Sequence, residues 1–357
     1  MLKISMDSYS FLKDGQEEPK VSVIVVTYNS ADFIGDLIQS LAQQTYKNFE
    51  VIFVDNNSSD NTVQKIWKVI NNLKLSNVKV YRNDYNIGYG KAVNQVVKAV
   101  NDSKYLLIMN PDGFLSKDAL EEMVKTFEKD VDNIGIIQPK ILYTNGRINT
   151  YGNLFDRFGF IYLLKEGERE NEVNINATDF FYASGACFLI PTRLFRKVGG
   201  FDPDFFLYAD DLDLSWRVRL YGKKIVLASK AKYYHIGSAS LGQVKISLLK
   251  YYYTLRNTMV SLIKNYSLKY LLLRFPAFLF SHLIACVFLE KTQGKYYLYS
   301  YFNSLFYLFR NLKRLLCKRK LVQKNIRSVP DSEIDKYITK YFLPLLWLKT
   351  KEINACA

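Results

Sequence analysis

Short apolar runs alternate with amphipathic stretches through the first third of the chain. The runs are rich in Val and Ile and are too short for buried helices, so they predict strands that are buried on both faces. Predicted strands cover residues 21–27, 49–55, 78–82 and 105–109, and predicted helices cover residues 31–43, 61–72 and 89–100. Strands that alternate with helices predict an α/β fold with a mostly parallel, doubly wound sheet.

Beyond residue 135 the pattern is less regular. Two further strands are predicted at residues 135–143 and 180–190, and Gly222 is the expected stop of a helix over residues 210–221. The polar stretch between these two strands, residues 151–178, is rich in Asn and Glu. It predicts a surface loop that faces an acceptor.

Charge divides the chain into parts. We expect a leader at residues 1–20, a catalytic domain at 21–244 with halves at 21–115 and 116–244, and a tail at 245–357. The first 244 residues contain 29 basic and 29 acidic residues, so the net charge of +15 lies entirely in the tail. The tail is also aromatic and is predicted to be mainly helical. Basic and aromatic residues together are typical of proteins that bind an anionic membrane surface.

The basic, aromatic tail could also bind nucleic acid, or its apolar run could cross the membrane. Nucleic acid binding uses the same residue types, but the long aliphatic runs do not suit a wet polyanion interface, so we expect no nucleic acid partner. The longest apolar run, residues 275–289, is shorter than the roughly 20 residues that span a bilayer. An interfacial or re-entrant helix pair is the preferred interpretation, a tilted span comes second, and a buried core helix is the third alternative.

The cysteines and the start of the chain indicate the compartment. Cys187, Cys286, Cys317 and Cys356 have no short metal-binding spacing, and the first residues lack the charged and apolar regions of a secretory signal. A reducing, cytoplasmic setting follows. With a membrane-associating tail, we expect the protein at the cytoplasmic face of the cell membrane, either peripheral or monotopic.

Polar residues follow each predicted strand, where an open α/β sheet binds its ligand. The first strand leads into Thr27-Tyr28-Asn29 and not into a G-x-G-x-x-G loop, which argues against a dinucleotide site. After the second strand, Asp55 can accept the imide N–H of a uracil or thymine, whereas Ser59 and Asp60 are better explained as caps of the next helix.

The third and fourth strands are followed by candidates for binding a diphosphate. Asn86-Ile-Gly88-Tyr-Gly90-Lys91 offers a glycine turn before a helix N-terminus. Asn110-Pro111-Asp112 puts a carboxylate where a divalent cation would bridge two phosphates, although an Asx-Pro turn explains the same residues equally well.

Three acids and a histidine complete the candidates. Asp210 and Asp211 begin a predicted helix, and adjacent carboxylates that are partly desolvated raise one another's pKa toward useful basicity. Asp213 and Arg217, four residues apart, can pair on the same helix. His235 suits a transition-type metal, although a lone His is more often structural.

These motifs, in this order, resemble family 2 glycosyltransferases, in particular the rhamnosyltransferase-like branch. The resemblance covers residues 21–240 and rests on the segments at 21–29, 54–60, 86–90, 110–112, 183–190, 199–202 and 205–213, together with His235. It implies a GT-A fold, followed here by the membrane-associating tail. It also implies that Asp112 binds the metal, that His235 completes the metal shell, and that Asp211 is the catalytic base with Asp210 as second candidate.

The remaining site residues follow from the same resemblance. Nucleotide contacts are expected from Thr27, Tyr28, Asn29, Asp55, Asn86, Gly88, Lys91 and Asn110, and acceptor contacts from Ser184, Gly185 and Trp216. Two departures stand out, namely Asn110 where many relatives carry an acid and Asp210 where Glu is usual. The segment after the acids, Leu214-Ser-Trp-Arg217, lacks the Gln-x-x-Arg-Trp pattern of processive synthases, which favours one addition per binding event.

The expected activity is an inverting, metal-dependent transfer of one sugar, rhamnose being one candidate, from a dTDP- or UDP-sugar. The cofactor would be Mg²⁺ or Mn²⁺. The acceptor would be a lipid-linked or surface-polysaccharide glycan, with a polyprenyl carrier favoured and homo-oligomerisation left open. A non-catalytic nucleotide-sugar-binding or scaffold subunit is the alternative. A sugar-1-phosphate nucleotidyltransferase is disfavoured because its Gly-rich, basic loop after the first strand is missing.

Overall fold

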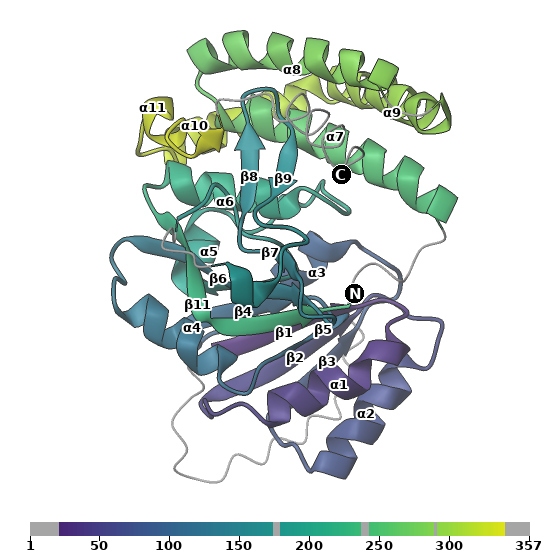
Figure 1. Cartoon of the computed structure of the whole chain (residues 1–357), viewed down its shortest axis with the longest axis vertical. Coiled ribbons are helices and arrows are strands. Elements are labelled where there is room, and N and C mark those ends of the chain that lie inside the picture. Colours follow the sequence, from purple (N-terminus) through teal and green to yellow (C-terminus); the bar gives the residue numbers. More distant parts are fainter. Residues whose placement is uncertain (1–20, 174–178, 237–242, 289–290, 340–357) are drawn as a thin grey trace.

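A nine-stranded mixed sheet forms the centre of this computed structural model, which describes residues 21–173, 179–236, 243–288 and 291–339 (Figure 1). The strand order is β3-β2-β1-β4-β10-β6-β11-β5, and β7 pairs with β6. The strands are β1 (Val21–Thr27), β2 (Phe49–Asp55), β3 (Val78–Arg82), β4 (Tyr105–Met109), β5 (Gly113–Leu115), β6 (Ile134–Tyr143), β7 (Ile148–Thr150), β10 (Cys187–Pro191) and β11 (Lys224–His235). Strands β1 to β4 are parallel, and β10 runs antiparallel to β4 and β6.

Helices cover both faces of this sheet. One face packs against α1 (Ala31–Ala42), α2 (Thr62–Leu73) and α4 (Ala119–Glu128), and the other packs against α3 (Tyr89–Val97), α5 (Thr192–Lys197) and α6 (Asp210–Leu220). In β1, Val23 and Val25 enter the first core, while Ile24 and Val26 enter the second. Strand β1 is apolar on both sides because each side packs against a layer of helices. The predicted doubly wound, mostly parallel sheet is confirmed.

Most of the predicted elements agree with the structure. The first four strands have the predicted bounds, and the first three helices differ by at most three residues at either end. The strand predicted at 180–190 is wrong in its first part, because only Cys187–Pro191 pairs with the sheet. Residues 180–186 make only isolated contacts with strands, from the Phe180 amide to the Ile225 carbonyl and between Tyr182 and Asn153. Gly185 then contacts Asp211 at the start of α6.

A second, three-stranded sheet lies where an acceptor-facing loop was predicted. Strands β8 (Asn153–Asp156) and β9 (Ile161–Leu163) form a hairpin, and β12 (Ile338–Thr339) pairs with β8. The prediction of a loop over 151–178 is therefore wrong for the hairpin, whose Phe155 is fully buried. Residues 174–178 of that stretch lie outside the described residues.

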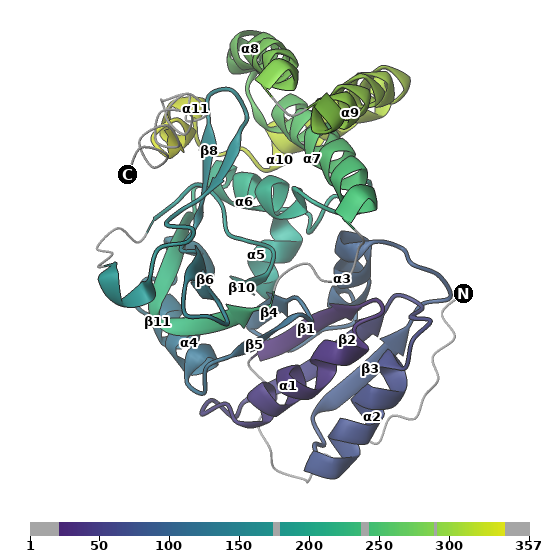
Figure 2. The same ribbon diagram turned by 45° about the vertical axis from the view of Figure 1, so that its right-hand side comes forward.

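The C-terminal region is a layer of helices on top of α6 (Figure 2). Its members are α7 (Gln243–Asn265), α8 (Leu268–Phe288), α9 (Lys291–Arg310), α10 (Leu312–Asn325) and α11 (Asp331–Ile334). A third core lies between α6 and these helices, with Trp216 and Leu212 on one side and Met259 and Tyr266 on the other. The region thus begins near the predicted boundary but shares a core with the catalytic part.

Helix α8 contains the longest apolar run and is a single helix with Pro276 inside it. Among the described residues it is the one helix long and apolar enough to cross a membrane, over Leu268–Cys286, and 22% of that segment is buried. Leu272, Leu273 and Phe280 are each about two-thirds exposed, which does not fit the third alternative, a core helix. Helix α8 packs beside α9, which is the arrangement expected of the predicted helix pair (Figures 1 and 2).

Candidate active site

The ends of β1 and β2 lie side by side and are joined through Asp55. Thr27 is in register with Asp55, and its hydroxyl donates to that carboxylate at 3.0 Å. The Ser58 amide donates to the other oxygen at 2.9 Å, and the Arg82 guanidinium lies 3.6 Å from it. Because Asp55 has no exposed surface, the structure does not support the predicted direct contact with a base. Asp55 and Thr27 instead shape the loop around them.

The loop after β1 presents Tyr28 to solvent. Its side chain is 48% exposed, whereas the next residue is held from both sides. Asn29 is in the left-handed region, its amide donates to the Ser58 hydroxyl at 2.9 Å, and its side chain accepts the Ser59 amide at 2.8 Å. Of the predicted nucleotide contacts here, Tyr28 and Asn29 are exposed, whereas Thr27 and Asp55 are buried.

Asp60 fits the capping explanation. Its carboxylate accepts the amides of Ala31 and Thr62, the first residues of α1 and α2, at 3.1 and 3.0 Å. Burial alone would raise its pKa, but these bonds and the Thr62 hydroxyl lower it below its usual range. Ser59 has a different partner, the Asn29 side chain, so the predicted cap is supported for Asp60 and not for Ser59.

The glycine turn before α3 is occupied by the protein itself. Gly88 has a φ of 88°, and a Cβ there would lie 2.9 Å from the Phe206 ring. Its amide donates to the Asn86 side chain at 3.0 Å, and the Tyr89 amide donates to the Phe206 carbonyl at 3.1 Å. The prediction that the Gly88 backbone cradles a diphosphate is therefore not supported, because close approach of Phe206 explains this glycine. Lys91 remains exposed on α3.

Asp112 and His235 are brought together by the pairing of β5 with β11. His235 is in register with Gly113, and its Nε2 atom lies 3.3 Å from a carboxylate oxygen of Asp112. That oxygen and both ring nitrogens of His235 are buried without a hydrogen-bond partner. Nitrogen and oxygen ligands that face each other unpaired fit a divalent cation. No third His, Cys, Asp or Glu joins them among the residues that the structure describes.

Asn110 contributes through its backbone. Its amide donates to the Ala186 carbonyl at 2.8 Å, and its carbonyl accepts the Tyr233 hydroxyl at 3.1 Å. These bonds tie the end of β4 to the loop before β10 and to β11. The segment that carries Asp112 is therefore fixed to the segment that carries Gly185.

Asp210 and Asp211 begin α6 in different surroundings. Asp210 is 8% exposed, and burial, followed by the charge of Asp211, raises its pKa to about 7. Asp211 is partly exposed and accepts the Gly185 amide at 2.7 Å and the Leu212 amide at 2.8 Å. Burial also raises the pKa of Asp211, while these two bonds oppose the rise. A Cβ at position 185 would lie 3.3 Å from the Asp211 carboxylate, so a glycine suits this close approach.

Tyr89 joins the two halves of the site. Its hydroxyl donates to the Gly185 carbonyl at 3.4 Å. Burial, and then the charges of Asp210 and Asp211 with a smaller contribution from Asp112, raise its pKa well above the ordinary value. One partly buried tyrosine is thus close to the candidate base and to the candidate metal ligand, which places these carboxylates around one region.

The acceptor side is corrected at Trp216. This residue has no exposed surface and packs edge-on against Phe155, Phe181 and Tyr266, so the predicted acceptor contact is wrong. The apolar residues of α6 recur at every second position from 212 to 220, which places them on two opposite sides of a helix and marks it as buried on both. That signal was available in the sequence.

Ser184 and Gly185 stay at the site, and Gln138 joins them. Both are half-buried, and the Ser184 amide donates to the Gln138 carbonyl oxygen at 2.7 Å. The buried amide nitrogen of Gln138 has no hydrogen-bond partner. No sequence signal singled out this glutamine, which lies in the middle of β6.

The fold and the site define a class, the glycosyltransferases of GT-A fold. Comparison with known proteins agrees, since residues 22–199 match the family described as Glycosyl transferase family 2. The chain belongs to that family and is a glycosyltransferase. The predicted rhamnosyltransferase-like resemblance is also confirmed by the relatives that follow.

Two relatives cover the same part of the chain. The O-antigen biosynthesis protein RfbC of Myxococcus xanthus is 25% identical over 229 residues, which are 62% of this chain and 18% of RfbC. The N-acetylglucosaminyl-diphospho-decaprenol L-rhamnosyltransferase of Mycobacterium tuberculosis is 25% identical over 246 residues, which are 62% of this chain and 77% of the relative. The chain therefore spans less than a fifth of RfbC but most of the rhamnosyltransferase.

Solved structures support the fold. GalNAc-T7 with UDP, GalNAc and Mn²⁺ superposes with a TM-score of 0.57 at 16% identity, covering 71% of this chain and 49% of that one. Residues 1–349 of S. aureus TarS give a TM-score of 0.53 at 20% identity, with 89% of each chain covered. The mannosyltransferase PcManGT from Pyrobaculum calidifontis in complex with GDP-Man and Mn²⁺ gives 0.53 at 15% identity, covering 86% of this chain and 87% of that one.

Proposed function

We propose that this glycosyltransferase moves a single sugar from a nucleoside diphosphate sugar to a glycan acceptor, with inversion at the anomeric carbon. The observation that carries the proposal is the position of Asp211. Its carboxylate is partly exposed at the start of α6, bonds the Gly185 amide at 2.7 Å, and connects through Gly185 and Tyr89 to the donor half. A base in that position can reach an acceptor hydroxyl beside the donor sugar.

In the proposed reaction, the acceptor hydroxyl attacks the anomeric carbon from the side opposite the nucleoside diphosphate. A new carbon–oxygen bond forms as the bond to the diphosphate breaks, and Asp211 takes the hydroxyl proton. A single displacement of this kind inverts the configuration. Asp210 is the second candidate for the base, because its pKa of about 7 also suits proton transfer.

Asp112 and His235 would hold the cofactor, Mg²⁺ or Mn²⁺. Their unpartnered oxygen and nitrogen atoms support this role, and the structures of GalNAc-T7 and PcManGT both contain Mn²⁺. When bound, a divalent cation neutralises the charge that develops on the leaving diphosphate. With two protein ligands, we expect phosphate oxygens to supply further ligands and the cation to bind weakly without donor.

The nucleotide would lie against the loops after β1 to β4. The exposed Tyr28 ring would contact the base or ribose, and Thr27, Asn29 and Asp55 would hold the loop that presents it. Lys91 is an exposed cation near the donor turn. Asn86 and Gly88 would shape that turn, and Asn110 would fix the metal-binding segment. A dTDP- or UDP-sugar is proposed, with rhamnose as one candidate because the mycobacterial relative is named as a rhamnosyltransferase.

The acceptor is proposed to be a polyprenyl-linked glycan, met at the cytoplasmic face of the membrane. The name of the mycobacterial relative describes a decaprenol-linked acceptor, and Ser184 and Gly185 border the Asp211 carboxylate on the acceptor side. Helices α8 and α9 lie at the end of the molecule farthest from α1 and α2 (Figures 1 and 2). We propose that this end binds the membrane surface.

The exposed side chains of this end suit a membrane. The exposed apolar residues of α8, α9 and α10 are Leu268, Leu272, Leu273, Phe280, Leu283, Leu298, Tyr299, Phe302, Phe306, Phe309, Leu312, Leu316 and Leu321, which we call the apolar face. Exposed basic residues alternate with them, among them Lys269, Lys295, Arg310 and Lys313. Apolar anchors beside basic groups match acyl chains beside anionic headgroups.

An Asp211→Asn variant tests the proposed function. Wild-type protein with Mn²⁺ should transfer sugar from a dTDP- or UDP-sugar to a polyprenyl-diphosphate glycan, and the variant should lose at least about 100-fold in kcat. Donor affinity, measured by calorimetry, should stay within about twofold, since Asp211 is not placed at the diphosphate. Asp36→Asn on the exposed side of α1 is the matched control. Equal kcat in the Asp211 variant would remove the base assignment.

A further inference from the structure

The loop before the catalytic helix has an unusual backbone. Tyr208 and Ala209 are both in the left-handed region, with φ values of 64° and 55°. Neither is a glycine, and non-glycine residues persist in this conformation only where their surroundings hold them. Asp210 and Asp211 follow immediately. The direction in which α6 begins therefore depends on whatever holds these two residues.

Helix α7 supplies the contacts that hold them. The side-chain amide of Asn257 donates to the Leu207 carbonyl at 2.9 Å and to the Tyr208 carbonyl at 2.7 Å. Its own oxygen accepts the Arg256 guanidinium at 2.8 Å, and Asn257 has no exposed surface. Arg256 in turn donates to the Asp204 carbonyl at 2.9 Å. Both amide hydrogens of one buried asparagine are thus used on the left-handed turn.

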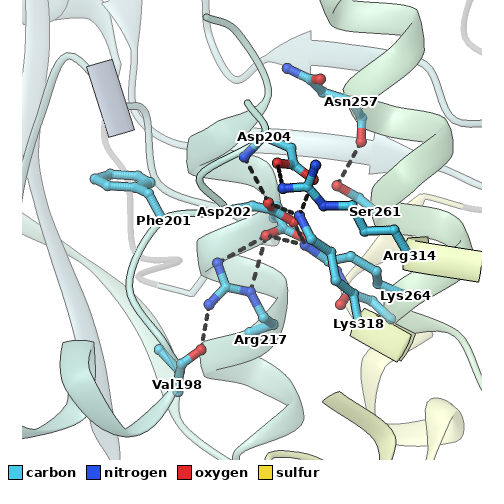
Figure 3. Close-up of polar contacts among 12 residues, drawn as sticks. Val198, Phe201, Asp202, Asp204, Arg217, Asn257, Ser261, Lys264, Arg314 and Lys318 are labelled. Carbon is cyan, nitrogen blue, oxygen red and sulfur yellow. Dashed lines mark hydrogen bonds and ion pairs between the residues drawn. The ribbon is translucent and has the colours of Figure 1, made fainter. Parts of the chain in front are cut away.

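A buried ion network holds the flanks of the same loop (Figure 3). Lys264 of α7 pairs with Asp202 before the turn and, at 3.0 Å, with Asp213 after it. Lys318 of α10 pairs with Asp202 and lies 2.6 Å from Asp204. The C-terminal helices therefore contact residues 202–213 through ion pairs at both ends and through hydrogen bonds at the turn.

The other side of the 202–213 loop contacts the residues of the candidate active site. The Phe206 carbonyl accepts the Tyr89 amide at 3.1 Å, and the Tyr89 hydroxyl reaches the Gly185 carbonyl. The Gly185 amide donates to Asp211. A change in the shape of the turn would therefore move Asp211 relative to Gly185 and would move the donor loop at Gly88.

We propose that Asn257 is a positioning residue of the transfer reaction, which holds Tyr208 and Ala209 left-handed so that Asp211 stays on the Gly185 amide. The inference rests on the proposed function, in which Asp211 is the base. It also makes the C-terminal helices part of the catalytic unit, in addition to their membrane role. Removing the C-terminal helices would uncover Asp213, Arg217 and Trp216. A truncated protein would therefore lose the packing around α6 as well as the proposed membrane contact.

An Asn257→Leu variant tests this, since leucine keeps the volume and loses both donors. With saturating donor and acceptor, kcat should fall about 10- to 100-fold, as expected when a reacting group is displaced by a fraction of an ångström to 1 Å. The dissociation constant for UDP or dTDP should rise by a smaller factor than kcat falls, because the donor loop meets this turn only through Phe206. The matched control is Asn325→Leu, at an exposed position on α10. Full kcat in Asn257→Leu would overturn the proposal.

A rescue variant separates positioning from general stability. Glycine adopts left-handed angles without a steric penalty, so Ala209→Gly should restore part of the lost kcat when combined with Asn257→Leu. If Asn257→Leu does not accumulate as folded protein, Asn257→Asp replaces it, because aspartate keeps the shape and the oxygen that meets Arg256. Double variants with no gain in kcat would contradict the proposed role.

Hydrogen exchange provides a readout that needs no activity. In Asn257→Leu, exchange at the amides of Gly185 and Tyr89 should accelerate, because their acceptors lie on or beside the loop. Exchange in β1 should be unchanged. Unchanged exchange at both amides would overturn the inference even if transfer is observed. If wild-type protein transfers no sugar, the proposed function fails, and the exchange result still decides whether Asn257 holds the loop.

Discussion

Two adjacent carboxylates at the start of α6 have opposite environments. Asp210 is enclosed and gains little compensation, whereas Asp211 is partly open and accepts two backbone amides. Environments that push neighbouring pKa values apart commonly separate the roles of two acids. These surroundings favour Asp211 as the proposed base, and burial disfavours the charged form of Asp210.

Asp210→Asn should stabilise the protein at alkaline pH. The folded pKa of Asp210 is raised to about 7, above the roughly 3.9 of an unfolded chain. A raised folded pKa gives stability that is complete below the unfolded pKa and is lost as the pH rises through 7. In the absence of metal, the variant should exceed wild type by about 1–3 kcal/mol at pH 8 and match it near pH 4. Thermal melts at both pH values measure this.

The control for that prediction is Asp84→Asn, an exposed carboxylate on the loop after β3. It should show the same pH dependence as wild type. A pH-independent difference between Asp210→Asn and wild type would mean that the charge of Asp210 carries no penalty in the folded state.

The site residues show where sequence reasoning reaches and where it stops. Motif order predicted Asp112, His235 and Asp211, and these residues are brought to one region by β5–β11 pairing and by the Gly185 loop. The sequence did not show that Asp55 is enclosed or that Gly88 meets Phe206, because their partners, Ser58, Arg82 and Phe206, depend on loop geometry. Sequence patterns report residue types, and hydrogen-bond partners between distant segments leave no periodic signal.

At the scale of elements, α7 is the helix that connects the two parts of the molecule. Its Lys264 is 3% exposed and lies between Asp202 and Asp213. Burial alone would raise the pKa of both acids, but the charges of Lys264 and Lys318 at Asp202, and of Arg217 and Lys264 at Asp213, hold each below its usual range. Helix α6 therefore depends on charges supplied by the C-terminal helices.

Lys264→Met should destabilise the fold by about 3 kcal/mol, because two buried carboxylates lose a shared partner. The lowered pKa values of Asp202 and Asp213 also predict how the stability of the protein changes with pH. Stability from these acids is present above about pH 4 and is lost as the pH falls below it, and the variant should lose less on acidification than wild type. Urea unfolding at pH 7 and at about pH 3, below the unfolded pKa of these acids, measures both effects. Lys269→Met, at an exposed position near the start of α8, is the control, and equal midpoints for both variants would contradict the prediction.

The predictability of the elements follows from how each is buried. Strands β1 to β4 are apolar runs covered on both faces, so their bounds could be read from the sequence. Strand β10 and the hairpin of β8 and β9 could not, since their pairing is set by distant segments such as β12. Helix α6 was recognised as a helix, but the layer that covers its outer side was not.

At the scale of the whole molecule, the apolar face on α8, α9 and α10 lies away from the sheet. We predict that Phe306→Glu combined with Phe309→Glu weakens binding to vesicles of phosphatidylglycerol and phosphatidylcholine by at least about tenfold, since each buried Phe contributes about 1.5–3 kcal/mol. Cosedimentation measures this. Both residues are more than half exposed, so folding should be unaffected.

Leu73→Glu combined with Val131→Glu is the matched control, because it adds the same two charges at exposed apolar positions outside the apolar face. It should bind vesicles as wild type does. Equal vesicle binding by the Phe306/Phe309 double variant and wild type would contradict the proposal that the apolar face contacts the membrane. Unchanged vesicle binding in high salt would show that the basic residues do not contribute to the affinity.

The pairing of β12 with β8 has a consequence for synthesis. Residues 338 and 339 complete a sheet whose other strands were made about 180 residues earlier. During translation, the hairpin edge and the outer side of α6 stay uncovered until the C-terminal helices leave the ribosome. Ribosome-bound nascent chains should therefore resist protease only after the segment around residue 339 has emerged, and chaperones would meet an incomplete but largely translated enzyme.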